Sequence, residues 1–320
     1  MNRLLVCSLV FIAPIALPAQ TASVPTDAPA GFIASAFSDW KAGRDGVQRM
    51  NLVGDSISPT GLSAFRLRFP ANVGKDSSKA EVHFHLGTQY VLVLKGTLVV
   101  GFGEDVDYGS VKEYTAEGFV VIPSGRPHYH WTRGETEIQI QSLGPSGTRP
   151  WPRIQRPLGM APPPPPPVDS THVRKNGLPE WTLLPNGAAR MNLAGNVPPS
   201  TTELFAYRTH RPTPRIHPDS IRMIYHYHFG TEHITVLRGT VYFAIGDKAE
   251  RSKAKAYGPG SFFENPAGAK HFEWFPIESV TQVAAIGSLG AIPLDPETGQ
   301  PLLVPPGQPP MGPAPAGQPR

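Results

Sequence analysis

Two parts of the chain contain the same sequence motifs in the same order. The segment His-Phe-His-Leu-Gly-Thr-Gln at residues 83–89 returns as His-Tyr-His-Phe-Gly-Thr-Glu at residues 226–232, which is 143 residues later. Pro-Ser-Gly-Arg-Pro-His at residues 123–128 returns at the same distance as Pro-Ala-Gly-Ala-Lys-His at residues 266–271. A repeat of this length predicts two domains with one fold.

A third shared segment lies upstream of these motifs in each copy. Arg-Met-Asn-Leu occupies residues 49–52 and again residues 190–193, and a tryptophan precedes it in both copies, at Trp40 and Trp181. The distance between these segments is 141 residues, so the two copies differ by two residues of loop.

Proline marks the ends of the two copies. The chain has 38 prolines in 320 residues, which argues against a helical protein because proline lacks the N–H group and clashes inside a helix. Six consecutive prolines at 162–167 predict an extended spacer, and the Pro- and Gly-rich end lacks apolar periodicity. We therefore expect a first domain at 30–155, a linker at 156–172, a second domain at 173–293 and a disordered tail at 294–320.

Within each copy the apolar segments are short and typical of β-strands. They are rich in β-branched and aromatic residues and are bounded by glycine or proline, whereas no helical pattern of similar strength follows the N-terminal segment. An all-β fold, a sandwich or barrel in each copy, is the prediction. The expected strands are residues 65–69, 90–94, 97–102 and 119–122 in the first copy and 234–237, 241–245 and 261–263 in the second.

The first 22 residues have the pattern of a secretory signal peptide. Arg3 precedes an apolar run over residues 4–17, and small residues follow where a peptidase could cut. The run is too short to cross a membrane, so we expect a secreted or periplasmic protein without membrane association after cleavage. Cys7, the single cysteine, would be removed, which leaves His, Asp, Glu and amide oxygens as metal ligands.

A set of metal-ligating side chains stands out in the second copy. His226 and His228 are two residues apart and so share one face of a strand. A Gly-Thr turn brings Glu232 to the next strand, and a returning strand supplies His271. Three imidazoles and one carboxylate suit a divalent transition metal such as iron, manganese, nickel or zinc, with coordination positions left for a ligand.

These motifs resemble those of the cupin superfamily. The pattern His-x-His-x3-Glu-x6-Gly is present as His226, His228, Glu232 and Gly239, and Gly-x5-Pro-x-Gly-x2-His is present as residues 260–271. The resemblance implies two tandem jelly-roll barrels, also called double-stranded β-helices, in the arrangement known as a bicupin. The glycine between the second His and the Glu is most similar to ChrR-like cupins and to small secreted bacterial cupins.

The first copy departs from the pattern at one ligand. His83, His85 and His128 align with the second copy, but Gln89 stands where the carboxylate is expected. An amide oxygen can coordinate a metal but is neutral, so it is a poorer ligand for a dication. Three interpretations remain open: a weaker metal site, a site with altered chemistry, or a barrel retained for packing.

Two further side chains are candidates for a role beside the ligands. Glu273 and His130 each follow the last histidine by two residues, so strand alternation would point both into the barrel. Glu273 is then a catalytic candidate, as a general base or as a carboxylate that orients an imidazole. The alternative is an exposed residue at the end of a strand. Phe243, Phe262 and Phe272 are expected to shape a pocket.

The reaction is open at this stage. We expect a mononuclear non-haem metal oxidoreductase of dioxygenase type acting on a small molecule, or alternatively a non-catalytic cupin that binds a metal or a sugar. Oxalate chemistry is disfavoured because related oxalate enzymes space the Glu one residue further and place an arginine just before the His pair, where only Arg222 comes near. A net charge of +4 without a basic stripe excludes nucleic acid as the expected partner, and a monomer or homodimer is possible.

Overall fold

The computed structural model describes residues 39–54, 61–71, 80–152, 178–185, 187–195, 203–214 and 223–302. The predicted signal peptide, the linker and the tail beyond residue 302 lie outside these ranges. The described residues form strands and two short 3-10 turns, and none of their helices is long and apolar enough to cross a membrane. The predicted all-β class is confirmed.

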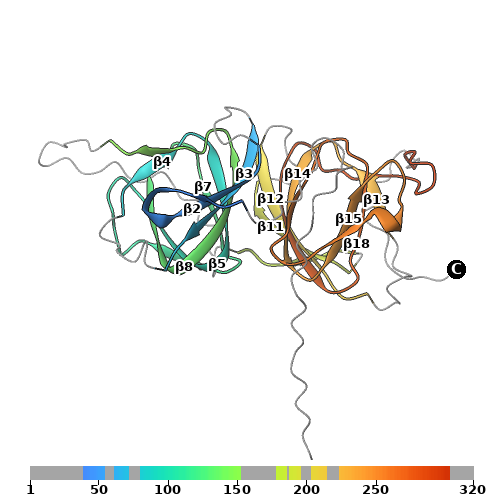
Figure 1. Ribbon diagram of the computed structural model, residues 1–320, viewed down its shortest axis with the longest axis horizontal. Coiled ribbons are helices and arrows are strands. Elements are labelled where there is room, and N and C mark those ends of the chain that lie inside the picture. The colour runs from blue at the N-terminus through green and yellow to red at the C-terminus, as the bar shows by residue number, and fades with distance from the viewer. Residues whose placement is uncertain are drawn as a thin grey trace, which may run out of the picture.

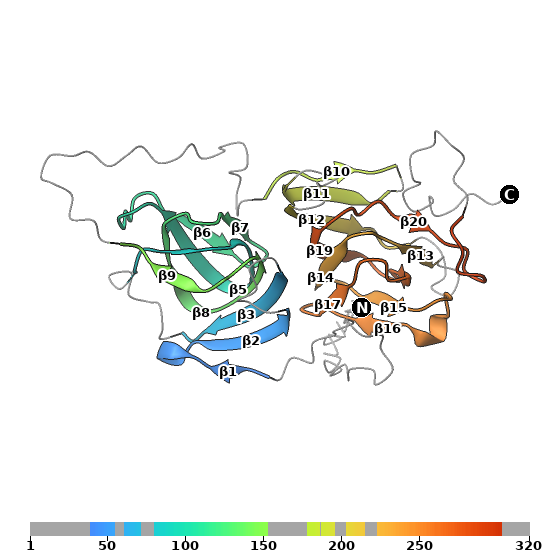
Figure 2. The ribbon, with the colours of Figure 1, turned by 90° about the horizontal axis from the view of Figure 1, so that it is seen from above.

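The described residues contain twenty strands, which form two barrels that lie side by side (Figures 1 and 2). Barrel 1 contains β1 (Lys41–Ala42), β2 (Gln48–Val53), β3 (Leu62–Phe69), β4 (His83–His85), β5 (Thr88–Phe102), β6 (Lys112–Thr115), β7 (Phe119–Ile122), β8 (His128–Leu143) and β9 (Thr148–Pro150). Barrel 2 contains β10 (Thr182–Leu183), β11 (Ala189–Ala194), β12 (Leu204–Arg211), β13 (Ile224–Tyr227), β14 (Thr231–Arg238), β15 (Val241–Ile245), β16 (Lys255–Tyr257), β17 (Phe262–Asn265), β18 (His271–Trp274), β19 (Ser279–Ile286) and β20 (Ile292–Pro293).

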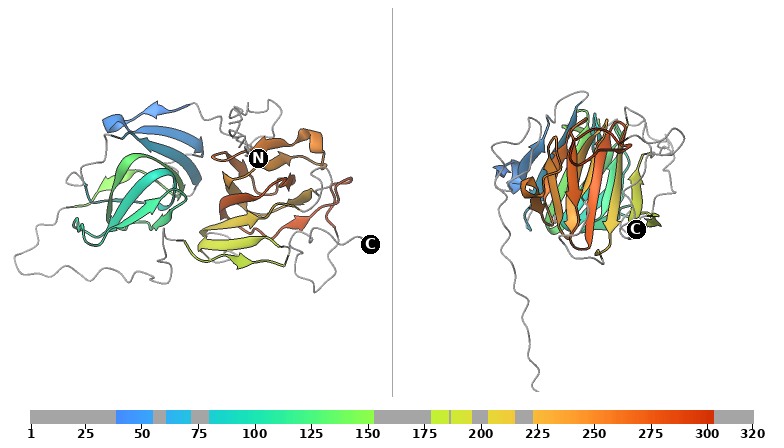
Figure 3. Two further views of the ribbon diagram at one scale, coloured as in Figure 1. Left: turned by 90° about the horizontal axis from the view of Figure 1, so that it is seen from below. Right: turned by 90° about the vertical axis from the view of Figure 1, so that its right-hand side faces the viewer.

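The strands of the two barrels pair in the same antiparallel order, which gives two sheets in barrel 2 and one continuous sheet in barrel 1. In barrel 2 the order is β10-β11-β12-β19-β14-β17 in one sheet and β16-β15-β18-β13-β20 in the other. In barrel 1 the long strands β5 and β8 continue from one sheet into the other, so all nine strands are joined. The left panel of Figure 3 shows both barrels from below.

In barrel 2 the counterpart of the long strand β8 is divided into β18 and β19, and this division has a local cause. Pro276 separates β18 from β19, and the equivalent residue in barrel 1 is Arg133, which pairs with Thr97 in the ladder between β5 and β8. Proline has no N–H group to donate to such a ladder, so the strand ends there. The two barrels therefore share one topology although their strand counts differ.

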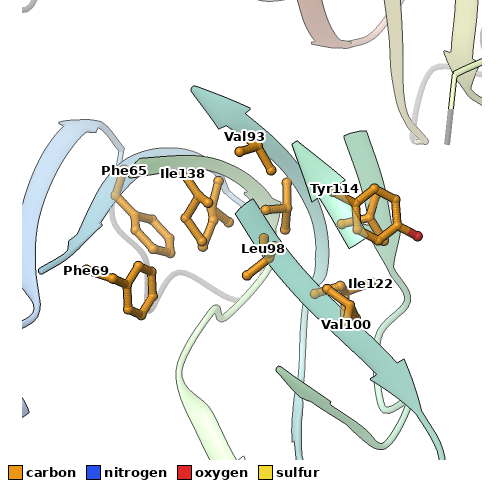
Figure 4. Close-up of a cluster of buried hydrophobic side chains, with 11 residues drawn as sticks. Phe65, Phe69, Val93, Leu98, Val100, Tyr114, Ile122 and Ile138 are labelled. Atoms are coloured by element: carbon orange, nitrogen blue, oxygen red, sulfur yellow. The ribbon is translucent and has the colours of Figure 1, made fainter. Parts of the chain in front are cut away.

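Each barrel has its own apolar interior. In barrel 1 the cluster includes Phe65 and Phe69 of β3, Leu98 and Val100 of β5, and Ile122 of β7 (Figure 4). In barrel 2 the cluster contains Phe205, Val236, Phe243, Phe263 and Val283, among others. Burial of these side chains is the main favourable contribution to folding of each barrel, at roughly 25 cal/mol per Å² of apolar surface.

The barrels pack against each other through a pair of matching contacts. Arg66 of barrel 1 donates to the Gly260 carbonyl of barrel 2 at 2.7 Å, and Arg208 of barrel 2 donates to the Glu117 carbonyl of barrel 1 at 2.6 Å. Both arginines are buried, and each also bonds a glutamine of its own barrel. Because the same repeat positions meet on both sides, the interface has approximate two-fold symmetry.

The second barrel extends beyond the boundary predicted at residue 293. Leu294 is buried in an apolar cluster with Tyr225 and Phe272, and Lys270 Nζ donates to the Gly299 carbonyl at 2.9 Å. Residues 294–302 therefore form part of barrel 2 rather than of the tail. The Asp295 carboxylate closes this turn by accepting from the backbone of residues 297 and 298, an interaction that composition alone does not reveal.

Candidate metal centres

Each barrel brings three histidines together from two neighbouring strands. In barrel 1, His83 and His85 belong to β4, and His83 pairs directly with His128 at the start of β8. In barrel 2, His226 pairs with His271 in the same way, across β13 and β18. Side chains of directly opposed strand residues lie on one face, so the pairing places all three rings of a barrel together.

A short loop fixes the third histidine relative to the first two. The N–H of Gly125 donates to the His85 carbonyl, and that of Gly268 donates to the His228 carbonyl, both at 2.7 Å. Both glycines have φ above 70°, a conformation that side chains with a Cβ rarely adopt. The Pro-x-Gly-x2-His motif therefore returns the chain so that its histidine faces the His-x-His pair.

Backbone carbonyls orient the imidazoles. His128 Nδ1 lies 3.0 Å from the Arg126 carbonyl, His271 Nδ1 3.0 Å from that of Ala269, and His228 Nδ1 3.1 Å from that of Leu289. A carbonyl only accepts, so Nδ1 must donate its proton in each case. Nε2 is then the nitrogen with a free lone pair, as a metal ligand requires.

The Nε2 atoms converge closely enough to share one ion. In each barrel one ring nitrogen from every histidine lies within 4.8 Å of the others, and His226 Nε2 is 2.9 Å from His228 Nε2. Two cis ligands of an octahedral ion at roughly 2.1 Å would be about 3.0 Å apart. The buried Nε2 of His128 has no hydrogen-bond partner. These donors fit a divalent transition metal, as predicted.

Burial lowers the pKa of five of these six histidines and so favours their neutral form. It lowers the pKa of His85 and of His271 to about 4, with a further contribution from neighbouring histidines. It also lowers the pKa of His226 and His128 well below the usual range. A neutral imidazole is the form that coordinates a metal, so these rings can bind one without a proton having to leave.

In barrel 2 a carboxylate lies beside the triad and is held by two partners. Glu232 Oε2 is 3.5 Å from His228 Nε2, Asn265 Nδ2 donates to the same oxygen at 2.8 Å, and the Tyr207 hydroxyl donates to Oε1 at 3.3 Å. The motif predicted Glu232 but neither of its partners. Asn265 directly precedes Pro266 within the second motif and pairs with Glu232 across the strands, so the strand register could have predicted this contact.

In barrel 1 the equivalent position has different neighbours. Gln89 is buried, its amide nitrogen donates to the Ser146 carbonyl at 3.2 Å, and its strand partner is Ile122. Its oxygen is the atom of that amide that can coordinate a cation. Ligation by Gln89 stays a prediction, as does ligation by Glu232.

Glu273 and His130 both lie within their barrels and are half-buried. Glu273 Oε1 is 3.6 Å from the Arg211 guanidinium, and burial raises the pKa of this carboxyl group while Arg211 opposes the rise. His130 packs against His83 with ring centroids 5.1 Å apart, and burial lowers its pKa to about 3. Of the two interpretations, the interior position fits better than an exposed strand end; the catalytic role of Glu273 stays a prediction.

Only one of the three phenylalanines expected at the pocket is near the ligands. Phe243 stacks on His271 with centroids 5.4 Å apart. Phe262 packs instead with Met50 and Leu52 between the barrels, and Phe272 lies in the outer apolar cluster with Trp274. The expectation is wrong for the latter two because neighbouring residues alternate between the faces of a strand.

A cavity of about 100 Å³ lies beside the triad of barrel 1. His85, His128, His130 and Gln89 line its polar part. The rest of its wall is mostly aliphatic and aromatic and includes Phe65, Leu98, Val100 and Ile122, four of the side chains labelled in Figure 4. Pockets with an apolar wall and a few convergent polar groups are typical of small-molecule sites.

Comparison with known proteins extends the fold assignment. No protein-family model matches the sequence, and no curated protein is similar to it. Among solved structures, a tryptophan-to-phenylalanine variant of oxalate decarboxylase from Bacillus subtilis matches with a TM-score of 0.50 and 14% identity, over 86% of this chain and 82% of that chain. A mutant form of the same enzyme matches with a TM-score of 0.51, 13% identity and the same coverage.

The fold is that of a bicupin. A cupin 2 conserved barrel domain protein from Leptotrichia buccalis also matches, at 12% identity over 78% of this chain and 92% of that one, but its TM-score of 0.46 is too low to add to the argument. Identities this low establish the shared fold of the bicupin and leave its reaction to be argued from the sites. Arg222, the residue nearest the position of an oxalate-binding arginine, lies outside the described residues.

Proposed function

We propose that this bicupin is a mononuclear non-haem metal oxidoreductase of dioxygenase type that acts on a small organic substrate. The observation that supports it best is the convergence of three imidazoles in each barrel, with Nδ1 of His128 and of His271 bonded to backbone carbonyls so that Nε2 is left for a metal. The bound metal would supply activation of O₂ and of the substrate, and both atoms of O₂ would enter the product.

The residues present suit such chemistry. His226, His228 and His271, with Glu232 beside them, would occupy up to four positions of an octahedral ion and leave two for ligands. Iron(II), manganese, nickel and zinc are all compatible with this donor set. Glu273, whose pKa is raised by burial, is a candidate to accept a proton from a substrate in barrel 2.

The resemblance to oxalate decarboxylase does not by itself transfer that activity. Oxalate is small and fully polar, whereas most of the wall of the barrel 1 cavity is apolar. The spacing of the Glu in the second copy also differs from that of oxalate enzymes. A substrate with an apolar part fits the described cavity better.

Export from the cytoplasm is part of the proposal. The N-terminal pattern around residues 4–17 supports a signal peptide, and the ChrR-like glycine supports a likeness to small secreted cupins. Detection of the mature chain in the periplasm or medium, with its new N-terminus near residue 23, would test this directly.

The decisive experiment measures metal and O₂ uptake on the same preparation. The protein is purified, loaded separately with iron(II), manganese, nickel and zinc, and its metal content is determined by elemental analysis. O₂ uptake is then followed with diketones, flavonols and small organic acids. We expect bound metal and substrate-dependent O₂ uptake. His271→Ala and His128→Ala should each remove the ion of one barrel, and the change in the active barrel should also abolish O₂ uptake.

Two results would count against the proposal in different ways. A protein that retains no metal under any loading condition contradicts the metal sites themselves. A protein that retains metal but consumes no O₂ with any substrate contradicts the oxidoreductase and supports the alternative, a bicupin that binds a metal or a small ligand without catalysis. Lys253→Ala, a change at an exposed residue outside both triads, serves as the control.

A further inference from the structure

One arginine faces the cavity of barrel 1 and has no role in the proposed metal chemistry. Arg49 belongs to the Arg-Met-Asn-Leu segment that the two copies share, and it is part of the cavity wall formed by β2. Met50 and Leu52, which alternate with it along the strand, pack toward barrel 2 instead. The repeated segment thus combines an interface face with a face toward the cavity.

The guanidinium of Arg49 is held in place, but only part of its hydrogen-bonding capacity is satisfied. Its carbon lies 3.6 Å from the centre of the Phe65 ring, and its Nε donates to Asn51 Oδ1 at 2.9 Å. Within the described part of the chain, its two terminal nitrogens have no hydrogen bond or ion pair. When a guanidinium stacks on a ring, the N–H groups along its edge stay free to donate. These groups can bind a carboxylate through two parallel hydrogen bonds.

The charge around this cavity is unbalanced. Arg49 is the one arginine in the lining, which contains no Lys, Asp or Glu. Burial also lowers the pKa of Arg49, which shows that its cation has lost hydration. A metal on the triad would add positive charge with no protein carboxylate to offset it.

The equivalent arginine of barrel 2 has a different electrostatic environment. Arg190 lies 4.0 Å from the centre of the Tyr207 ring, and the Tyr207 hydroxyl bonds to Glu232. That barrel therefore provides its own anion near the arginine and the triad. Barrel 1 has Phe65 and Gln89 at these positions, so an anion there has to come from a ligand.

We propose that Arg49 binds the carboxylate of the ligand of barrel 1, and that this ligand is a monocarboxylate with a compact apolar body. The inference rests on the proposed function insofar as the cavity beside His85 and His128 is taken to be the substrate site. The aliphatic wall then contacts the apolar body. About 100 Å³ has room for roughly seven to ten water-sized groups, which is the size of benzoate.

The test compares benzoate with benzamide, which has nearly the same shape and no charge. Binding is measured by calorimetry on the metal-loaded protein. We expect one benzoate site per chain and benzamide binding at least about tenfold weaker, since charge-assisted hydrogen bonds are the stronger kind. Arg49→Gln should weaken benzoate binding by about tenfold to a hundredfold and leave benzamide binding unchanged. Arg49→Lys should recover part of the loss because it restores charge without the bidentate edge.

The control is Arg68→Gln. Arg68 also stacks on an aromatic ring, that of Trp40 at 4.1 Å, but it does not line the cavity. The Arg68→Gln variant should bind benzoate as tightly as the parent protein does. Metal content and thermal melting of every variant are measured alongside, so that loss of the fold is not mistaken for loss of the anion site.

Three outcomes would overturn the inference: benzamide binding as tightly as benzoate, an Arg49→Gln variant that binds benzoate normally, or oxalate binding more tightly than benzoate. Failure of the proposed function is recognised separately. If the protein takes up no metal or consumes no O₂ but still shows benzoate binding that depends on Arg49, the anion site stands and the oxidoreductase does not. The benzoate–benzamide comparison on the parent protein needs no variant.

Discussion

The two barrels have the same topology and the same three histidines but differ in the side chains next to them. Barrel 2 surrounds its triad with hydrogen-bonding and charged groups, whereas barrel 1 has apolar or neutral residues at the matching places. The pairs are Tyr207 and Phe65, Glu232 and Gln89, Asn265 and Ile122, Arg211 and Phe69, and Glu273 and His130, in the order barrel 2 then barrel 1. The difference shows that strand pairing sets the triad and that single residues set its electrostatics.

The interface between the barrels shows the same contrast. Arg66 and Arg208 make equivalent contacts, but they do so to the carbonyls of Gly260 and Glu117, which are equivalent positions with different side chains. Glu117 has φ of 65° and adds a carboxylate that pairs with Arg238 at 2.7 Å. The backbone contact is preserved, and only the side-chain interaction differs.

The largest expected effect is loss of a metal from one barrel at a time. His271→Ala should remove the ion of barrel 2 and leave that of barrel 1, and His128→Ala should do the reverse, because each triad belongs to a single barrel. Elemental analysis of both variants and of His210→Ala, a histidine outside the triads, tests this. Loss of both ions from either single variant would contradict the independence of the two centres.

Exchange of the differing ligand should change metal affinity in opposite directions. Glu232→Gln should weaken binding in barrel 2, and Gln89→Glu should tighten it in barrel 1, each by about tenfold to a hundredfold, because a carboxylate offsets the charge of the ion and an amide does not. Competition with a metal chelator measures both. Unchanged retention after Gln89→Glu would show that residue 89 is not a ligand.

The partner of the carboxylate should matter less than the carboxylate itself. Asn265→Ala removes the hydrogen bond to Glu232 Oε2 and should weaken metal binding in barrel 2 by about tenfold. Ile122→Asn, made together with Gln89→Glu, should add to the gain in barrel 1 because it supplies the missing partner. If the double variant binds metal no more tightly than Gln89→Glu alone, the orientation of the carboxylate is set by the backbone alone.

Acid should destabilise the metal-free protein, and more so through barrel 1. Its histidines have pKa values lowered by burial, so below pH 6.5 the unfolded chain binds protons that the folded chain does not. The free energy of unfolding should be constant above that pH. Between pH 6.5 and about 4 it should fall, and each such histidine contributes up to about 1.4 kcal/mol for every pH unit. Glu232 counteracts the shift at His271, whereas His128 has no such carboxylate among the causes of its shift.

Denaturant unfolding of the metal-free protein at a series of pH values checks this prediction. The Gln89→Glu variant is the informative comparison, because a carboxylate beside the barrel 1 triad should reduce the acid sensitivity. A free energy of unfolding that does not change between pH 7 and 5 would contradict the prediction.

The smallest expected effect concerns the interface. Glu117→Gly makes barrel 1 like barrel 2 at this position, relieves a left-handed conformation worth about 1 kcal/mol, and removes a largely exposed ion pair with Arg238 worth about 0.2–1 kcal/mol. The two contributions oppose each other, so the free energy of unfolding should change by less than about 1 kcal/mol. Urea denaturation measures it, with Arg238→Ala as the variant that loses the pair alone.

Much of the candidate site follows from local patterns. The His-x-His spacing places two rings on one strand face, the glycine-containing loop returns the third, and the 143-residue repeat places the same arrangement in both halves. These features depend on residues close together in the chain or on a repeated motif, so they are visible in the sequence. The error at Phe262 and Phe272 came from ignoring the alternation along each strand.

The amino-acid sequence by itself determined that this protein is all-β, that it has two equivalent barrels, and that each brings three histidines together. Only the tertiary structure decided what surrounds them: that Asn265 and Tyr207 hold Glu232, that Arg49 faces an apolar cavity in barrel 1, and that matching arginines join the barrels. The physical reason is distance along the chain. Motifs act through neighbouring residues and strand periodicity, whereas these contacts join strands that meet only when the sheets close.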